Sequence, residues 1–140
     1  MHSRSVAHLA ACLVLALPAG CASTQKLSVQ TVPEGAQVYL QRKGEVEVSA
    51  NVVGFHGSVR PGSFEEEFFS LGTSPVDYEF QLEEREAAVQ GGGAGGSVTR
   101  HYTEGLIRIV LEGYRTVERL VRFSGSRIDL ELTMQPTNEE

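Results

Sequence analysis

Two histidines, His56 and His101, are the residues of this chain best suited to metal or acid–base chemistry. A zinc site needs a third ligand, and the glutamates at 65–67 are the nearest candidates. The histidines lack the HExxH and HxH spacings that place two imidazoles side by side. The spacing therefore favours two unconnected loop histidines, and a metal-dependent hydrolase built on them stands as a separate hypothesis.

Other catalytic patterns do not occur in the sequence. There is no Gly-x-Ser-x-Gly nucleophile elbow, and the glycine-rich run at 91–96 lacks the Gly-Lys-Ser/Thr ending of a phosphate loop. The glutamates at 65–67 lack the Asp/Asn/Gly pattern of a calcium loop, so they indicate a solvated acidic face. We therefore expect no enzymatic activity, no cofactor and no metal.

The N-terminal residues 1–20 resemble an export signal. Arg4 supplies a basic start, residues 6–17 are apolar except for His8, and small residues lead to Cys21. A helix over 6–17 would rise only about 18 Å, short of the ~30 Å hydrocarbon core. A cleaved secretory signal is therefore favoured over a transmembrane span.

The end of this signal resembles a bacterial lipobox, Leu17-Pro18-Ala19-Gly20 followed by Cys21. The resemblance implies cleavage before Cys21 and acylation of its thiol and amine, and two or more chains anchor a protein stably. Ala22 resembles outer-membrane sorting, so we expect an envelope lipoprotein at the outer membrane facing the periplasm, with 21–26 as a tether. The alternative is cleavage after Ala22 and a soluble secreted or periplasmic protein.

Composition restricts the remaining classes. The 140 residues carry 12 Lys+Arg against 18 Asp+Glu, a net charge of −6 that argues against a nucleic-acid partner. Acidic residues gather in the middle of the chain and arginines near its end. Two interpretations stay open for the arginines: cross-strand ion pairs, or a face that contacts anionic glycan or lipid headgroups. These arginines are Arg108, Arg115, Arg119, Arg122 and Arg127.

Apolar residues alternate with polar ones through most of the chain, which predicts strands. The turn at 33–35 is expected to join two strands as a hairpin, and residues 124–126 to form another hairpin link. Loops are expected at 54–63 and 90–97. The pattern predicts an all-β fold, a small antiparallel β-sandwich. Its expected strands are 27–32, 36–41, 45–53, 76–82, 107–111, 115–123 and 127–134.

Three ordered landmarks resemble the PEGA domain family. The first is the signature tetrapeptide between two strands, the second is a Gly-Thr-Pro element with one residue inserted, and the third is a Gly-Tyr turn between late strands. The residues that carry the resemblance are Pro33, Glu34, Gly35, Ala36, Gly72, Thr73, Pro75, Gly113 and Tyr114.

The resemblance covers residues 27–135, followed by a polar tail at 136–140. It implies a compact β-sandwich of the kind to which transthyretin-like domains also belong, found on envelope proteins and without enzymatic activity. This chain departs from the family in two long loop insertions, at about 42–71 and 83–104. Loops on a rigid scaffold often carry specificity, so we expect the insertions to distinguish this protein.

The first insertion is rich in phenylalanine. These side chains are expected to plug one end of the sandwich, with an apolar patch for a protein partner as the alternative. They are Phe55, Phe64, Phe68 and Phe69.

The function expected from these features is a non-enzymatic, membrane-anchored envelope lipoprotein. Its sandwich would mediate protein or cell-wall contacts while acyl chains on Cys21 hold it to the membrane. The alternative is a module that binds peptidoglycan, another glycan or a small ligand through the C-terminal arginine face.

Overall fold

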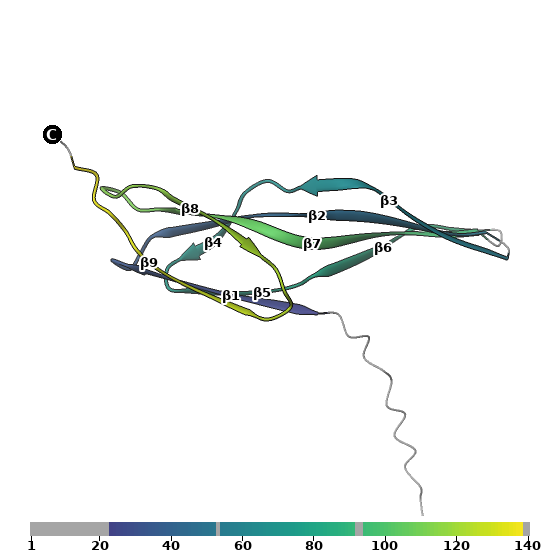
Figure 1. Cartoon of the computed structure of the whole chain (residues 1–140), viewed down its shortest axis with the longest axis horizontal. Helices are drawn as coiled ribbons and strands as arrows, with labels where there is room; N and C mark the ends of the chain where they lie inside the picture. Colours follow the sequence, from purple (N-terminus) through teal and green to yellow (C-terminus); the bar gives the residue numbers. More distant parts are fainter. Residues whose placement is uncertain (1–22, 53, 92–93, 139–140) are drawn as a thin grey trace, which may run out of the picture.

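The computed structural model describes residues 23–52, 54–91 and 94–138. Figure 1 shows an elongated molecule built from strands. Within the described residues there are nine strands and no helix, and so no helix long and apolar enough to cross a membrane. The strands are β1 (Thr24–Val32), β2 (Gln37–Val52), β3 (Phe55–Glu65), β4 (Phe69–Thr73), β5 (Val76–Gln81), β6 (Glu83–Gly91), β7 (Ala94–Val110), β8 (Val117–Arg122) and β9 (Arg127–Thr133).

These strands form two sheets. Sheet A has the order β5-β1-β9, and the larger sheet B has the order β3-β2-β7-β6, with β4 also paired to β2 and β8 to β7. The described pairs are antiparallel except β1–β9, which is parallel. Sheet A packs over one half of sheet B (Figure 1). The all-β sandwich expected from the alternating pattern is confirmed.

The core lies between sheet A and the half of sheet B made by β4, β2, β7 and β8. Alternation on each strand turns its apolar side chains toward the other sheet. The burial of β5 follows this period, with Val76, Tyr78 and Phe80 inward, as the sequence predicted. The fully buried members include Leu27, Val29, Val38, Leu40, Ile107 and Ile109.

Beyond the sandwich, the central strands of sheet B continue as a single layer. β2 and β7 remain paired from Gln37 opposite Val110 to Val52 opposite Ala94. β3 and β6 flank them in this distal half, which Figure 1 shows projecting away from sheet A. We call this part, the described residues of 45–63 and 83–101, the arm.

The loops expected at 54–63 and 90–97 are wrong, because most of these residues form strands of the arm. Residues 55–63 lie in β3, and residues 90–91 and 94–97 lie in β6 and β7. Their glycines and proline suggested loops, but backbone pairing needs no side chain. Pro61 is tolerated because β3 is an edge strand with a register shift opposite Val46 and Val48. The two insertions are therefore regular strands that lengthen sheet B.

The predictions of hairpins at the 33–35 turn and at 124–126 are also wrong, because the strands on either side of each turn do not pair with each other. β1 pairs with β5 and β9 in sheet A, whereas β2 belongs to sheet B, so the first turn crosses between sheets. β8 and β9 are separated in the same way. The turn expected between the two late strands does join a pair, because β7 and β8 run antiparallel on either side of it. Alternation identifies which face of a strand is buried, but not which neighbour it pairs with.

The expected tether is shorter than predicted, because β1 begins at Thr24. Gln25 is buried, and its side-chain oxygen accepts hydrogen bonds from the amides of Ser124 and Gly125 at 3.0 and 3.3 Å. The fold therefore starts three residues after Cys21, which itself lies outside the described residues.

Candidate functional surfaces

The turn that carries the PEGA-like tetrapeptide is joined to the turn before β5. The Gly35 amide donates to the Ser74 carbonyl at 3.0 Å, and the Ser74 amide donates to the Ala36 carbonyl at 2.8 Å. The Ser74 hydroxyl, which is buried, hydrogen-bonds Thr31 and accepts from the Ala36 amide. Ser74 is the residue inserted into the Gly-Thr-Pro element, so the insertion itself connects the two landmarks.

The landmark residues gather at the end of the sandwich away from the arm. Thr73 and Val110 both pair with Gln37, which puts the second and third landmarks at the level where β2 begins. Gly35, Gly72 and Gly113 have positive φ, a conformation glycine adopts without strain. Ala36 is fully buried, whereas Pro33, Glu34, Gly35, Thr73, Pro75 and Gly113 are exposed and Gly72 and Tyr114 are half-buried. These residues shape the turns at this end of the sandwich.

The polar tail is partly held by the Gly113–Tyr114 turn. The Thr137 amide donates to the Gly113 carbonyl at 3.0 Å, and Tyr114 forms a bridge with Pro136. The C-terminal residues up to Thr137 therefore lie against the landmark end.

The histidines do not share a site. His56 pairs with Asn51 of β2, whereas His101 pairs with Glu45, six positions along the same strand and roughly 20 Å away at the usual strand rise. His56 is exposed near the end of the arm. Among the described residues, no group of three or more His, Cys, Asp or Glu side chains is arranged to hold a metal.

His101 belongs instead to a network of polar and charged side chains on one face of the arm. Its Nε2 lies 3.2 Å from Glu47 Oε2 and its Nδ1 lies 3.0 Å from Glu83 Oε1. Arg60 contacts Glu45 and Glu47 at 3.3 and 3.5 Å. Most of these groups are well exposed, so each pair contributes little to stability. We call this side of the arm its polar face.

A second charged cluster lies where the sandwich meets the arm. Arg42 Nε lies 2.8 Å from Glu66, and the Tyr102 hydroxyl donates to Glu66 at 3.1 Å and to Glu84 at 2.8 Å. Arg42 Nη1 is 3.9 Å from Glu84. The Arg42 side chain is only 13% exposed. We call these four residues the junction cluster.

Aromatic rings surround the Arg42 guanidinium. Its central carbon lies 4.2 Å from the centre of the Tyr102 ring, 5.2 Å from Phe80 and 5.3 Å from Phe69. Cation–π attraction is strongest where water is excluded, as it is here. Burial is the largest single influence on Arg42 and lowers its pKa. The hydrogen bond to Glu66 and the electrostatic attraction of Tyr102, Glu66 and Tyr78 together outweigh burial, so the pKa is raised. Burial and the hydrogen bond to Glu84 raise the pKa of Tyr102 above its ordinary value.

Sequence reasoning missed the junction cluster, although a signal was present. Val38, Leu40 and Arg42 share one phase of β2, so the period that identified the core also points Arg42 inward. A buried charge must have a partner. Its partners Glu66 and Glu84 come from the connection before β4 and from β6, and no local pattern links them to Arg42.

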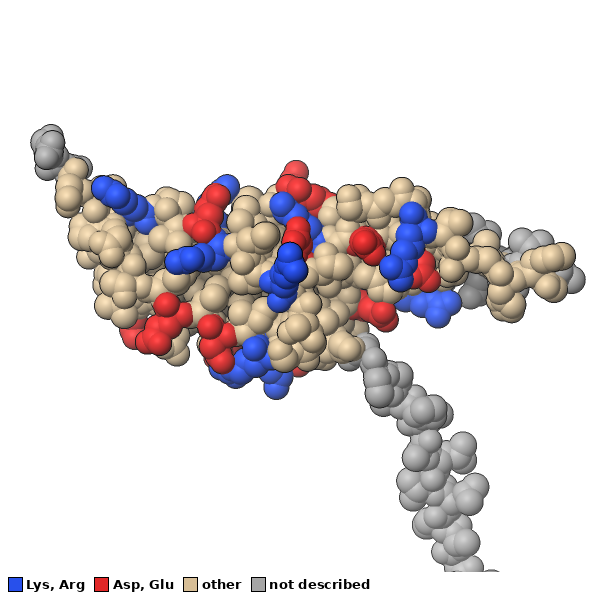
Figure 2. Space-filling model, in the orientation of Figure 1, with Lys and Arg blue, Asp and Glu red and all other residues tan. Residues whose placement is uncertain are grey.

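The late arginines do not form a common face. Arg119 shares the phase of the core residue Ile107, whereas Arg122 points to the opposite side of β8, opposite Glu104. Arg127 belongs to sheet A. Arg108 pairs with Glu118 at 2.8 Å across β7 and β8 and also stacks on Phe68. In the view of Figure 2, acidic and basic side chains are interspersed rather than segregated.

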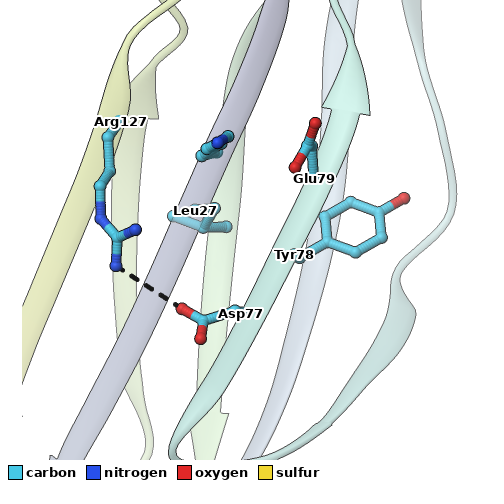
Figure 3. A pocket seen from close by; sticks show the side chains of 6 residues that line it. Leu27, Asp77, Tyr78, Glu79 and Arg127 are labelled. Carbon is cyan, nitrogen blue, oxygen red and sulfur yellow. Dashed lines mark ion pairs between the residues drawn. The ribbon is translucent and has the colours of Figure 1, made fainter.

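A pocket of about 300 Å³ lies on sheet A beside Arg127 (Figure 3). Arg127 reaches across β1 toward Asp77, with 3.8 Å between Nη2 and Oδ1, and its Nε bonds Asp129 at 2.7 Å. Lys26 and Glu79 complete the charged lining. Asp77 of β5 and the late arginine Arg127 thus form a cross-strand ion pair, one of the two interpretations left open by the sequence. The lining contains two basic and two acidic side chains, so its charge favours neither an anionic nor a cationic ligand.

The phenylalanines of the first insertion divide between the core and the surface. Phe64 and Phe69 pack against the core, and the Phe64 ring meets Tyr102 edge-on at 5.4 Å. They close the sandwich at the junction, as expected. Phe55 is 79% exposed on the arm.

Fold and geometry thus define an all-β sandwich whose larger sheet extends into an arm. A scan against protein-family models finds no match to this chain, and neither does a search of curated protein sequences.

Proposed function

We propose that this chain is a non-enzymatic envelope lipoprotein, anchored through Cys21, whose PEGA-like sandwich contacts envelope proteins or the cell wall. The observation that carries the proposal is the short distance between the lipobox-like sequence and the fold. Only two residues, Ala22 and Ser23, lie between Cys21 and Thr24, where β1 begins. A fully extended tether of this length spans about 10 Å.

The start of the fold also supports anchoring, because it is held at a fixed place. The Leu82 amide donates to the Ser23 carbonyl at 2.9 Å, next to the point where the chain passes from β5 to β6. An acyl anchor on Cys21 would therefore keep the root of the arm close to the membrane. Confinement of this kind raises the effective concentration of the protein toward envelope partners.

Metabolic labelling with a radioactive fatty acid tests the anchor. We expect the wild-type chain to incorporate label and to fractionate with membranes, and Cys21→Ser to lose both properties. Cys12→Ser is the matched control, because Cys12 lies within the proposed signal and the variant should label like wild type. A wild-type chain without label, or a labelled Cys21→Ser chain, would refute lipidation at this residue.

Crosslinking in cells tests the contact function. A photo-crosslinking residue at Ser58 samples the arm, and one at Thr133 samples sheet A. We expect one recurrent envelope protein to be captured from the arm position and no enrichment on purified peptidoglycan. Recovery on peptidoglycan without a crosslinked protein would instead support the glycan-binding alternative.

A further inference from the structure

The two faces of the arm differ in chemistry. The polar face carries Glu45, Glu47 and His101, as described above. The residues between those of the polar face point to the opposite side of the sheet. On this side Glu84 and Glu86 of the edge strand β6, with Arg100 of β7 opposite Glu84, form a charged margin. The rest of this side, on β3, β2 and β7, carries small and branched apolar side chains. We call it the apolar arm face, and it comprises Val46, Val48, Ala50, Phe55, Val59 and Val98.

Cross-strand register shows that these residues share one side. Val48 of β2 stands between Val59 of β3 and Val98 of β7. Phe55 is four residues away from Val59 on β3 and in the same phase. Their side chains are 79% and 66% exposed. Exposed apolar patches of this kind mark interaction sites.

The apolar arm face continues the inner face of the sandwich. Gly44 of β2 pairs with Phe64 and Tyr102, both of which pack in or against the core, and Val46 follows in the same phase. In the sandwich, sheet A covers this side of sheet B. Sheet A ends at the junction with the pair Thr24 and Gln81, so in the arm no described strand covers it.

Sheet A therefore ends in a step at the junction, and the apolar arm face lies on the lower level of this step. Packed sheets are about 10 Å apart, so sheet A projects about one layer beyond the apolar arm face. A flat bilayer that rests on sheet A would not reach into this step. A single second sheet would fill it, and an amphipathic sheet requires such a second layer.

We infer that this second layer is the arm of another copy of the same chain. The two arms would stack apolar face to apolar face about a two-fold axis, the commonest symmetry of homodimers. They must run in opposite directions, because parallel stacking would place sheet A of each copy in the space taken by sheet B of the other copy. Each arm then occupies the step beneath the other, and the sandwiches lie at opposite ends of the dimer.

The area of the arm is sufficient for such a contact. Eight residues of strand across four strands cover about 26 by 19 Å at standard strand spacings, with the charged margin on β6 as part of a polar rim. This is roughly 500 Å² on each copy and about 1,000 Å² in total, the lower limit for a specific interface. Small residues such as Ala50, Gly57 and Gly96 keep the face smooth enough for sheets to approach closely.

Sedimentation equilibrium of the mature protein purified from cells tests this dimer, in detergent if the protein is lipidated. We expect twice the protomer mass for wild type at tens of micromolar. Val98→Lys should give the protomer mass, with at least a tenfold weaker association. Thr99→Lys is the matched control: it adds the same charge to the next residue of β7, on the polar face, and should stay dimeric.

Val59→Lys provides a second variant, because this edge-strand side chain is already exposed and a lysine there should leave the fold intact, as circular dichroism would verify. It too should dissociate the dimer, whereas Ser58→Lys should not. A wild-type chain that remains monomeric would overturn the inference, and so would a dimer unaffected by both Val98→Lys and Val59→Lys. If the protein is monomeric and binds phosphatidylethanolamine/phosphatidylglycerol vesicles, and Val98→Lys abolishes this binding, the partner of the apolar arm face is a membrane and the dimer is refuted. The association state is measured without reference to fatty-acid labelling at Cys21. A failure of the dimer and a failure of the proposed anchor can therefore be told apart.

Discussion

The two halves of sheet B share the same two central strands but not the same environment. In the sandwich half, Val38 and Ile109 face each other across β2 and β7 under sheet A, and both are fully buried. In the arm, Val48 and Val98 face each other in the same way but remain partly exposed. Alternation of apolar and polar residues along a strand therefore shows that one face of the strand is apolar. It does not show that another sheet covers that face.

The transition between the halves is sharp. Gly44 pairs with Tyr102 at a register shift in β2, and the junction cluster fills the inner face at the same level. The charged Arg42 replaces the aliphatic side chains that precede it in β2. A polar and aromatic plug thus ends the core, and the apolar arm face begins beyond it.

The largest expected effect concerns Gly44. A Cβ at this position would lie 1.8 Å from the carbonyl oxygen of His101, which is backbone and cannot rotate away. Gly44→Ala should therefore force β2 and β7 apart and lower the free energy of unfolding by more than about 3 kcal/mol. Urea denaturation monitored by circular dichroism measures this change.

Gly57→Ala is the control for that substitution. Gly57 belongs to β3 of the arm, and a Cβ there would meet no atom within 4 Å. Its free energy of unfolding should stay within about 0.5 kcal/mol of wild type. Equal unfolding midpoints for the two alanine variants would mean that the strands are not closely paired at the junction.

The same side-chain truncation in both halves of β2 should have unequal effects. Val38→Ala removes two methyl groups from a fully buried site and should cost about 2–3 kcal/mol. Val48→Ala should cost less than about 1 kcal/mol, because its side chain is already partly exposed. Denaturation at low micromolar concentration keeps self-association from adding to the second value. Similar losses would show that the apolar arm face is covered within the monomer.

The sequence predicted the sandwich more fully than it predicted the arm. Alternation at 76–82 and 127–134 identified strands whose apolar sides are buried as expected. The distal strands were partly hidden because Pro61, Gly95 and Gly96 are typical of loops. Their strand conformation depends on pairing with a partner strand, which composition does not encode.

The candidate surfaces were harder to predict than the fold. Arg42 is held by Glu66 and Glu84, which are distant in sequence, so only the assembled sheets reveal the cluster. Conversely, His56 and His101 were considered together because each falls in an insertion. The register of β2 places them far apart. Contacts between distant segments were the missing information in both cases.

Removing the Tyr102 hydroxyl should have an intermediate effect that depends on pH. Tyr102→Phe removes hydrogen bonds to Glu66 and Glu84 and should cost about 1 kcal/mol near pH 7. The folded state raises the pKa of Tyr102, so it holds the phenolic proton more tightly than the unfolded chain does. The resulting stabilisation is complete below the unfolded pKa, near 10, and is lost as the pH rises above it.

The difference in unfolding free energy between wild type and Tyr102→Phe should therefore shrink above pH 10. Urea denaturation from pH 7 to pH 11 measures it. Tyr39→Phe is a suitable control, because Tyr39 is a half-exposed tyrosine on the other side of β2 from Arg42 and lies outside the junction cluster. A constant difference across the range would contradict a hydroxyl buried among carboxylates.

The smallest effect is expected on the polar face of the arm. Glu47→Gln weakens contacts to His101 and Arg60 but should cost less than about 0.5 kcal/mol, since exposed ion pairs contribute little. That cost should fall further between 0.05 and 1 M NaCl, where the screening length drops to about 3 Å. Glu66→Gln in the junction cluster should cost more and respond less to salt, because Arg42 is largely shielded from water. If salt reduced both costs equally, the junction would be as hydrated as the arm, and the core would not end there in a sealed plug.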